Sequence, residues 1–316
     1  MKKIAVIGAG NIGGRYIESL LNSDFECALY IVDTSAQALK VLAEKISSNK
    51  KKVIYLLNIE ELPDYIDLAA ITTTSGVRRG VAEKLLDCVD VNYLILEKPL
   101  FCDLTDYEFV RTLLEKKHVK AWINCTRREC ESYQRLKREL KGENFEFALS
   151  GSNWGLGCNA VHYLDLICFL AETDDLEVNV DGLYKMVLES KRKPYKEILG
   201  TITGNAGKCV HFSLTAHGRD EIPTSILIKT SSKTYLINEA RQLLSIWEKS
   251  GLFVNVGFEL PYTSQIMAKI IEKILDTGNC QLADYSESMA IHKVLQIPLT
   301  DFFEEMGGKK GICPIS

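Results

Sequence analysis

The glycine-rich run near the start of the 316-residue chain has the residue types and spacing to bind phosphate. Gly8-Ala9-Gly10-Asn11-Ile12-Gly13 matches G-x-G-x-x-G and lies between an apolar run and a helical pattern. In such a turn Gly8 permits a tight bend, Gly10 lets a pyrophosphate approach the backbone, and Gly13 lets the helix pack close to the strand. The first N–H groups of that helix, with Asn11 and Ile12, then face the phosphates. The sequence predicts a dinucleotide site here.

A carboxylate follows at the distance that such a site requires. Asp33 ends the second apolar run, twenty residues after Gly13, where an acid binds the ribose hydroxyls of the adenosine. Because a 2′-phosphate would be repelled there, the sequence favours NAD over NADP as the cofactor. Asp33 or Thr34 can also cap the helix that begins near Ser35, and one residue can serve both purposes.

Three threonines follow the fourth apolar run. Thr72, Thr73 and Thr74 lie where an open α/β sheet presents polar groups to a ligand, at the carboxyl end of a strand. We expect them to line the cofactor site. Capping of the next helix by Thr74 or Ser75 is the compatible alternative.

A lysine and a histidine have the types needed for proton transfer. Glu97-Lys98-Pro99 ends the fifth apolar run, and the proline restricts Lys98 to extended geometry. His162 lies in a helical pattern that starts near Gly157, on one face with Cys158 and Asp165. Asp165 is spaced to orient the imidazole or stabilise its charge. The alternatives are a surface Glu-Lys pair and a histidine that packs in the core.

Four of these motifs together resemble one family. They are Gly8–Gly13, Asp33, Glu97-Lys98-Pro99 and His162-Tyr163-Leu164-Asp165. The chain is similar over nearly its whole length to the glucose–fructose oxidoreductase, inositol dehydrogenase and MocA family (Gfo/Idh/MocA). The Glu-Lys-Pro triplet is the most specific of the four.

The resemblance implies roles for individual residues. It implies that Lys98 is catalytic, that the Lys98–Pro99 bond is cis, that His162 assists Lys98, and that Glu97 contacts the ribose next to the nicotinamide. Many sugar and inositol dehydrogenases of the family carry an aspartate at the position of Cys158. A thiol is a poor substitute for a carboxylate that relays protons. We therefore expect Lys98 and His162 to act without a third acid, with Cys158 as a wall residue and Asn159 binding substrate.

Two further places are expected to line the substrate pocket. Asn124, Arg127 and Arg128 follow the sixth apolar run, and Arg127 can bind a carboxylate or phosphate. Trp154 follows the seventh run and can stack on a sugar face. The alternatives are an exposed charge at a helix start and a hydrophobic plug.

The pattern of elements predicts an α/β protein of two domains. Up to residue 124, apolar strands alternate with helices, which indicates a doubly wound parallel sheet covered on both faces. From 125 to 316 several strands follow one another with few helices between them. This indicates an α+β domain with a large, mostly antiparallel sheet that binds substrate and mediates oligomerisation. The expected strands are 3–7, 27–32, 53–57, 68–71, 93–96, 120–124, 145–150, 178–189, 197–203, 208–216, 225–230, 233–238 and 243–247.

Composition narrows the possible partners. The formal net charge is −4, whereas a general nucleic-acid or membrane binder is usually more basic. No apolar run is long enough for a signal peptide or a membrane span, so we expect a cytoplasmic protein. None of the ten cysteines forms a C-x-x-C pair, and we expect neither a metal site nor a disulfide. An open sheet face needs covering, and we expect a homodimer or homotetramer.

The function that these features favour is hydride transfer between a nicotinamide cofactor and a secondary alcohol or ketone. The expected substrate is a small sugar, cyclic polyol or nucleotide-sugar. Two alternatives stay open at this point: a regulator or sensor that binds NAD(P) without catalysis, and a reductase of another substrate such as a tetrapyrrole.

Overall fold

The computed structural model describes residues 1–46, 51–218 and 221–316. The chain forms two compact units. The first consists of Met1–Phe101, Thr105–Thr126 and Pro261–Ser286, and the second of Cys102–Leu104, Arg127–Leu260 and Glu287–Ser316. A single division after residue 124 does not capture this arrangement, because the chain returns to the first unit at Pro261.

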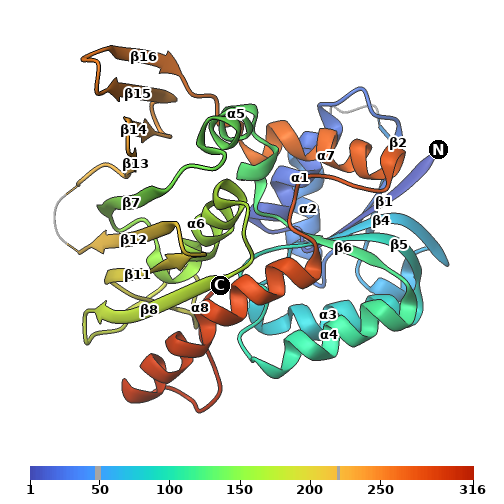
Figure 1. The fold of residues 1–316 in the computed structure, drawn as a ribbon. Coiled ribbons are helices and arrows are strands. Elements are labelled where there is room, and N and C mark those ends of the chain that lie inside the picture. The colour runs from blue at the N-terminus through green and yellow to red at the C-terminus, as the bar shows by residue number, and fades with distance from the viewer. Residues whose placement is uncertain (47–50, 219–220) are drawn as a thin grey trace. The chain divides into compact units, whose positions relative to one another are not determined.

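The first unit is a six-stranded parallel sheet in the order β3-β2-β1-β4-β5-β6. Its helices α1, α2 and α7 lie on one face, and α3 and α4 lie on the other (Figure 1). The strands are β1 Lys2–Ile7, β2 Cys27–Val32, β3 Val53–Leu56, β4 Tyr65–Ile71, β5 Asp90–Leu96 and β6 Lys120–Ile123. The helices are α1 Asn11–Leu21, α2 Ala36–Ile46, the 3₁₀ helix η1 Ile59–Glu61, α3 Ser75–Cys88, α4 Thr105–Lys117 and α7 Thr263–Thr277.

Burial explains why the strands are apolar throughout. Ile4–Ile7 of β1 and Leu68–Ile71 of β4 are buried on both sides because helices cover both faces of the sheet. The late helix α7 packs on α1, and the backbone N–H of Ala268 donates to Ser19 Oγ at 2.9 Å. The strand order and connections are those of a doubly wound dinucleotide-binding sheet.

The second unit is built on an eight-stranded sheet in the order β16-β15-β14-β13-β7-β12-β11-β8. Neighbouring strands are antiparallel except β7 and β12, which are parallel. The strands are β7 Phe145–Ser152, β8 Leu176–Leu183, β11 Gly200–Ala206, β12 Val210–His217, β13 Ser225–Thr230, β14 Lys233–Asn238, β15 Leu243–Glu248 and β16 Phe253–Gly257. A two-stranded ladder pairs β9 Leu188–Glu189 with β10 Lys196–Glu197. The predicted fold class is confirmed.

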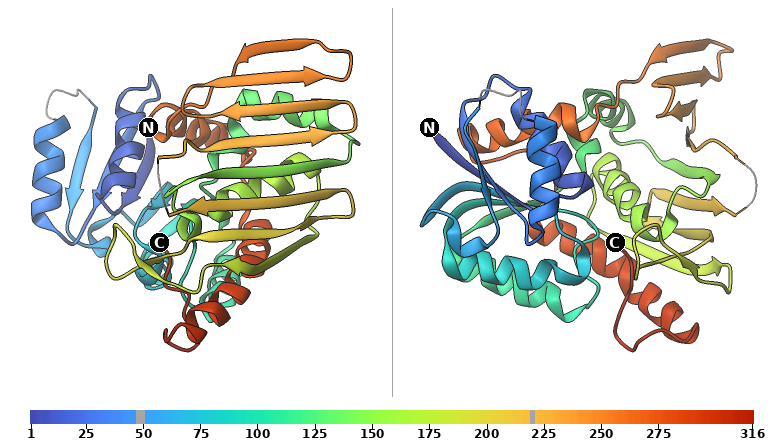
Figure 2. Two further views of the ribbon diagram at one scale, coloured as in Figure 1. Left: turned by 90° about the vertical axis from the view of Figure 1, so that its left-hand side faces the viewer. Right: turned by 180° about the vertical axis from the view of Figure 1, so that it is seen from behind.

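One face of this sheet is covered by helices. In β7 the residues Phe145, Phe147 and Leu149 are buried, whereas Glu146, Ala148 and Ser150 between them are not. The buried set faces helix α6, which is itself apolar on nearly every side. Figure 2 (left) looks onto the opposite face, over which no described helix lies. The helices are η2 Thr126–Glu129, α5 Glu131–Leu140, α6 Leu156–Ala171 and α8 Tyr285–Glu305, whose Glu287–Glu305 part belongs to this unit.

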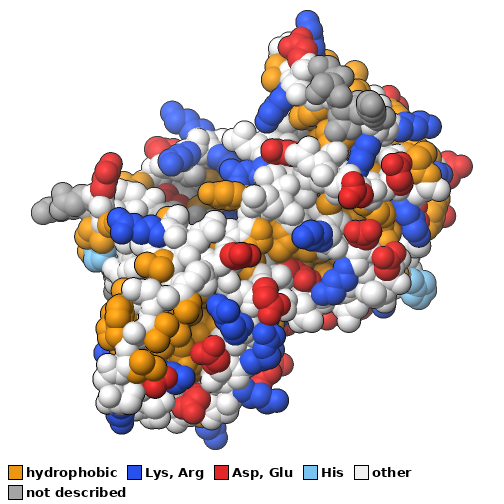
Figure 3. Space-filling view, turned by 90° about the horizontal axis from the view of Figure 1, so that it is seen from above, with side chains coloured by type: hydrophobic (Ala, Val, Ile, Leu, Met, Phe, Trp, Pro, Cys, Tyr) orange, Lys and Arg blue, Asp and Glu red, His pale blue; other side chains and the backbone are white. Residues whose placement is uncertain are grey.

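The surface carries charges of both signs. On the face in Figure 3, lysine and arginine side chains are interspersed with aspartate and glutamate. Within the described ranges, no helix is both long and apolar enough to cross a membrane. Among the same residues, no group of three or more His, Cys, Asp and Glu side chains is arranged to hold a metal ion.

Candidate functional site

The glycine turn has the geometry that phosphate binding needs. Gly8 has φ +105°, which favours glycine, and a Cβ on Gly13 would lie 1.8 Å from the carbonyl oxygen of Gly8. Gly10 caps α1 with its backbone alone, and a Cβ there would meet nothing within 4 Å. Gly10 and Asn11 are exposed, and Ile12 is half-buried. The first N–H groups of α1 therefore border open space.

Asp33 holds the turn from the end of β2. Its Oδ2 accepts the N–H of Ala9 at 2.7 Å, and its Oδ1 accepts the N–H of Ser35 at 2.8 Å. Ser35 Oγ accepts the N–H of Ala38 at 3.2 Å, so Ser35 caps α2 rather than Asp33 or Thr34. A carboxylate oxygen can accept more than one hydrogen bond, and Asp33 is half-exposed. The side chain can therefore brace the turn and still accept ribose hydroxyls.

The three threonines after β4 have separate positions. Thr72 Oγ1 donates to the carbonyl oxygens of Gly8 at 2.7 Å and Ile7 at 3.0 Å, so it braces the glycine turn. Thr74 caps α3 without a side-chain hydrogen bond. Thr73 Oγ1 is buried and has no hydrogen-bond partner among the described residues.

Glu97 and Lys98 occupy the turn after β5. Glu97 is buried, and its Oε1 accepts Tyr16 Oη at 2.9 Å and Asn124 Nδ2 at 2.5 Å. Burial and the Glu97 charge raise the pKa of Tyr16 well above its usual value, which keeps this donor protonated. The Lys98–Pro99 bond is cis, as the family resemblance implies, and Lys98 is half-buried. A surface Glu-Lys pair is therefore excluded.

Two buried polar atoms at these strand ends fit a bound ligand. Asn124 Nδ2 is held by Glu97, which turns Asn124 Oδ1 away from it, and this oxygen has no partner within the described chain. Thr73 Oγ1, at the end of β4, is in the same situation. Buried polar atoms are nearly always hydrogen-bonded, so both indicate a group that is added to the fold. Together with the open space at Gly10, they fit a nicotinamide dinucleotide.

Helix α6 of the second unit has one face that is polar and less buried than the rest of the helix. From Ala160 to Leu170 every residue of α6 is buried except His162. His162 shares this less buried face with Cys158 and Asn159, four and three residues earlier. Cys158 Sγ lies 3.6 Å from the carbonyl oxygen of Gly155, and Asn159 Nδ2 donates to that of Trp154 at 2.8 Å. This face is therefore the polar and less buried side of an otherwise buried helix.

The carboxylate of Glu197, which belongs to β10, lies at the start of α6. Glu197 of β10 accepts the backbone N–H groups of Gly157 and, at 3.0 Å, of Ile198. A Cβ on Gly155 would lie 3.0 Å from Cys158 Sγ and 3.3 Å from Glu197 Oε2. Glu197 therefore caps the start of α6 and lies near Cys158. No sequence signal linked Glu197 with Gly157, which lie 40 positions apart.

Trp154 is held in place by its own unit. Its indole N–H donates to the carbonyl oxygen of Thr215 at 2.8 Å, and its ring meets Tyr163 edge-to-face at 5.4 Å. The ring is half-buried. Trp154 is therefore partly a plug, and the remaining exposed part is what a substrate could contact.

Arg127 is paired with a carboxylate of its own unit. Its Nε and Nη2 bind the two carboxylate oxygens of Glu239 at 2.8 and 2.7 Å, and Nη2 also donates to Tyr163 Oη at 3.0 Å. Tyr133 Oη adds a hydrogen bond to Glu239 at 2.5 Å. A guanidinium in a bidentate pair with a carboxylate is held firmly in one orientation. The structure thus gives Arg127 a partner within its own unit, and its binding of a substrate anion stays a prediction.

Asp165 also has another partner than expected. Its Oδ2 accepts Arg128 Nε at 2.9 Å, and Arg128 Nη1 pairs with Glu287 at 2.7 Å. Burial raises the pKa of Asp165 to about 6, although Arg128 opposes the shift. The spacing of three residues suggested a His162–Asp165 pair, but η2 brings Arg128 to this carboxylate. We therefore do not assign Asp165 to catalysis.

The sequence of the first unit matches a known protein family. Residues 2–125 match the model of the Gfo/Idh/MocA family, described as an oxidoreductase family with an NAD-binding Rossmann fold. These residues form a Gfo/Idh/MocA NAD(P)-binding domain. The family resemblance predicted from the sequence is confirmed. No curated protein sequence is significantly similar to the chain.

Solved structures extend the likeness in fold beyond the Gfo/Idh/MocA domain. UDP-N-acetylglucosamine 3-dehydrogenase from Acidithiobacillus ferrooxidans is 14% identical, with a TM-score of 0.72 over 94% of this chain and 96% of that one. Biliverdin reductase from Synechocystis, bound to biliverdin and NADP+, is 14% identical, with a TM-score of 0.73 over 93% and 97%. A Gfo/Idh/MocA family oxidoreductase from Vibrio cholerae is 16% identical, with a TM-score of 0.72 over 97% and 100%. These likenesses establish the fold of both units.

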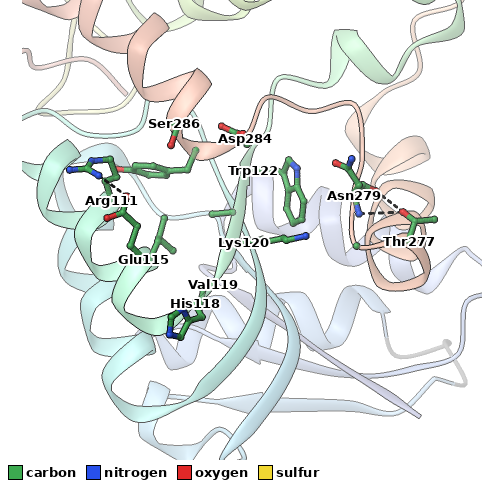
Figure 4. A pocket seen from close by; sticks show the side chains of 14 residues that line it. Arg111, Glu115, His118, Val119, Lys120, Trp122, Thr277, Asn279, Asp284 and Ser286 are labelled. Carbon is green, nitrogen blue, oxygen red and sulfur yellow. Dashed lines mark hydrogen bonds and ion pairs between the residues drawn. The ribbon is translucent and has the colours of Figure 1, made fainter.

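A large hollow of the Gfo/Idh/MocA unit lies away from these residues. It has a volume of about 820 Å³ and lies beside the start of β6 and the carboxyl ends of α4 and α7 (Figure 4). His118, Lys120, Asn279 and Asp284 border it, and all four are exposed. Ligands of open α/β sheets bind at the carboxyl ends of the strands. The glycine turn, and not this hollow, is therefore the candidate site for a cofactor.

Proposed function

We propose that the chain is an NAD(P)-dependent oxidoreductase that interconverts a secondary alcohol and a ketone. The substrate class is a sugar, a cyclic polyol or a nucleotide-sugar. The observation that carries the proposal is the glycine turn after β1 with open space beside Gly10, together with Lys98 in the turn after β5, which is separated from β1 by β4 in the same sheet. A dehydrogenase of a nucleotide-sugar among the proteins of similar fold supports the substrate class.

Different residues of the first unit bind different parts of the cofactor. The N–H groups at the start of α1 bind the pyrophosphate, and Asp33 accepts hydrogen bonds from the adenosine ribose. The buried oxygens Thr73 Oγ1 and Asn124 Oδ1 would form hydrogen bonds with the nicotinamide end of the cofactor. When bound, the nicotinamide accepts or donates the hydride. Because Asp33 repels a 2′-phosphate, NAD is the preferred cofactor.

Proton transfer falls to Lys98 and His162. In oxidation, Lys98 accepts the proton of the substrate hydroxyl as the hydride leaves the carbon, and in reduction it returns that proton. His162, on α6 of the second unit, is assigned to proton transfer as the second acid–base group. A positioned acid–base group contributes about 10²- to 10⁴-fold to the rate. Cys158 and Asn159, which share the less buried face of α6 with His162, are assigned to substrate contact.

The test is a turnover assay with the full chain. NADH and NADPH formation or consumption is followed with sugars, polyols, nucleotide-sugars and biliverdin, and both cofactors are titrated by fluorescence. Lys98→Met is expected to lower kcat at least 100-fold and to change the cofactor Kd less than threefold. Lys117→Met, at an exposed lysine of α4, is the matched control.

Three results would overturn the proposal in different ways. Tight cofactor binding without turnover of any substrate in the panel would indicate a sensor. Turnover of biliverdin alone would indicate a tetrapyrrole reductase. A chain that binds neither dinucleotide would leave no basis for hydride transfer.

A further inference from the structure

We propose that Arg78 is a positioning residue that holds the Lys98 turn against the threonine loop. The proposal rests on the proposed function, because it concerns the geometry of that same site. Arg78 touches neither substrate nor cofactor in this scheme. It acts through the two loops that carry Thr73 and Lys98.

The contacts of Arg78 run to main-chain atoms of both loops. The side chain lies in the first turn of α3 and is 1% exposed. Its Nη1 donates to the carbonyl oxygens of Pro99 and, at 2.6 Å, Leu100, and its Nη2 donates to that of Thr73. β4 and β5, which end at these loops, are neighbours in the sheet. One planar group therefore fixes the spacing between the two loops.

The chemistry of the side chain suits this task. A guanidinium presents its donors in a rigid fork, whereas a lysine ammonium is a single point at the end of a flexible stem. Burying a cation is costly, and apolar residues of similar volume often stabilise a fold equally well or better. A buried arginine directed at three carbonyl oxygens is therefore better explained by the geometry it imposes than by stability.

The geometry matters because Lys98 immediately precedes Pro99. A shift of this turn moves the Lys98 amine relative to the carbon that gives or takes the hydride. A misplacement of about 1 Å far from the reacting atoms can cost about 100-fold in rate. Thr73, whose carbonyl oxygen accepts the hydrogen bond from Arg78 Nη2, belongs to the loop that we assign to the cofactor. Loss of Arg78 thus disturbs the alignment of acid–base group and cofactor.

The experiment compares Arg78→Lys and Arg78→Met with Arg79→Met. Arg79 is the neighbouring residue, is partly exposed and pairs with Glu83 at 2.7 Å. With a substrate from the panel, both Arg78 variants are expected to lose 10- to 100-fold in kcat. KM and the cofactor Kd are expected to change less than threefold, and Arg79→Met is expected to match the wild type. All assays are made below the melting temperature of each variant.

A second measurement does not depend on turnover. The rate at which an amine-reactive reagent modifies Lys98 is followed by peptide mass spectrometry in the wild type and the variants. A loosened turn is expected to raise this rate at least threefold in both Arg78 variants and to leave it unchanged in Arg79→Met. If the wild type binds no dinucleotide, the proposed function fails, but this measurement still decides the role of Arg78.

Two outcomes would overturn the role of Arg78. One is a folded Arg78→Lys variant with the kcat and Lys98 modification rate of the wild type. The other is a lower melting temperature in either variant with both of these quantities unchanged, which would assign Arg78 to stability alone. Arg78→Lys keeps the charge, so the proposal can still be tested if Arg78→Met does not fold.

Discussion

Gly10 and Gly13 occupy one turn but are glycines for different reasons. A methyl group on Gly13 would collide with the carbonyl oxygen of Gly8, whereas a methyl group on Gly10 meets no protein atom and Gly10 has φ −71°. We expect Gly10→Ala to change the free energy of unfolding by less than about 0.5 kcal/mol. The same methyl group stands where the pyrophosphate approaches, so the dinucleotide Kd is expected to rise at least tenfold.

Chemical denaturation and fluorescence titration check the two parts of this prediction. Gly13→Ala is the contrast, because its collision is with backbone and is expected to lower the free energy of unfolding. If Gly10→Ala binds NAD and NADP as tightly as the wild type, the phosphates do not lie at this turn.

Asp165 is expected to make stability depend on pH. Burial raises its pKa from the usual 3.8 to about 6. Between about pH 4 and 6 the folded chain thus holds a proton that the unfolded chain has released, and the free energy of unfolding falls as the pH rises. Asp165→Asn removes this contribution. The difference in unfolding free energy between pH 4.5 and 6.5 is expected to shrink by about 2 kcal/mol.

Urea denaturation at the two pH values measures this difference. Glu287→Gln is the control, because Glu287 pairs with the same arginine but is partly exposed. An Asp165→Asn variant with the pH dependence of the wild type would show that Asp165 is ionised throughout this range.

At the scale of elements, helix α6 depends on a residue of β10. Glu197 accepts the N–H of Gly157, one of the N-terminal donors that have no partner within the helix. Glu197→Ala is expected to cost about 1 kcal/mol of unfolding free energy, measured by denaturation. Glu189→Ala, which breaks a more exposed pair with Lys196, is expected to cost less. Equal effects of the two variants would contradict a capping role for Glu197.

Most elements could be predicted because their patterns are local. Periodicity and glycine breaks placed 27–32, 225–230 and 233–238 with the bounds that the structure has. The short strand β16 was missed, because Phe253–Gly257 has only five residues and no long apolar run. The parallel pairing of β7 with β12 could not be predicted either, since it joins strands far apart in the sequence.

The site could be predicted only where its residues share one element. The glycine turn and Asp33 follow one βαβ unit of known spacing, and His162 shares a helix with Cys158 and Asn159. The ion pairs of Arg127 with Glu239 and of Asp165 with Arg128 were not foreseen, because the partners come from other elements. Arg78, Glu197 and the orientation of Asn124 depend on the same kind of distant contact. Such contacts leave no spacing pattern in a single sequence.

At the scale of the whole molecule, the open face of the eight-stranded sheet is expected to bind a second copy of the chain. Leu227 lies on that face between Ala148 and Leu236 on the neighbouring strands. Near the sheet edge, Trp247 and Phe253 are 40% and 50% exposed and stack on each other. Contiguous apolar side chains of this kind commonly mark an interface. We expect a homodimer or homotetramer in solution.

Sedimentation velocity over a range of concentrations measures the state of assembly. Leu227→Arg places an unpaired charge in the expected interface, where its desolvation is costly, and is expected to yield monomers. Lys141→Glu changes the charge by two units, more than Leu227→Arg does, at an exposed position after α5, outside that face, and is expected to leave the assembly intact. A wild-type chain that stays monomeric at high concentration, or a Leu227→Arg variant that assembles normally, would show that this sheet face is exposed to solvent in the working protein.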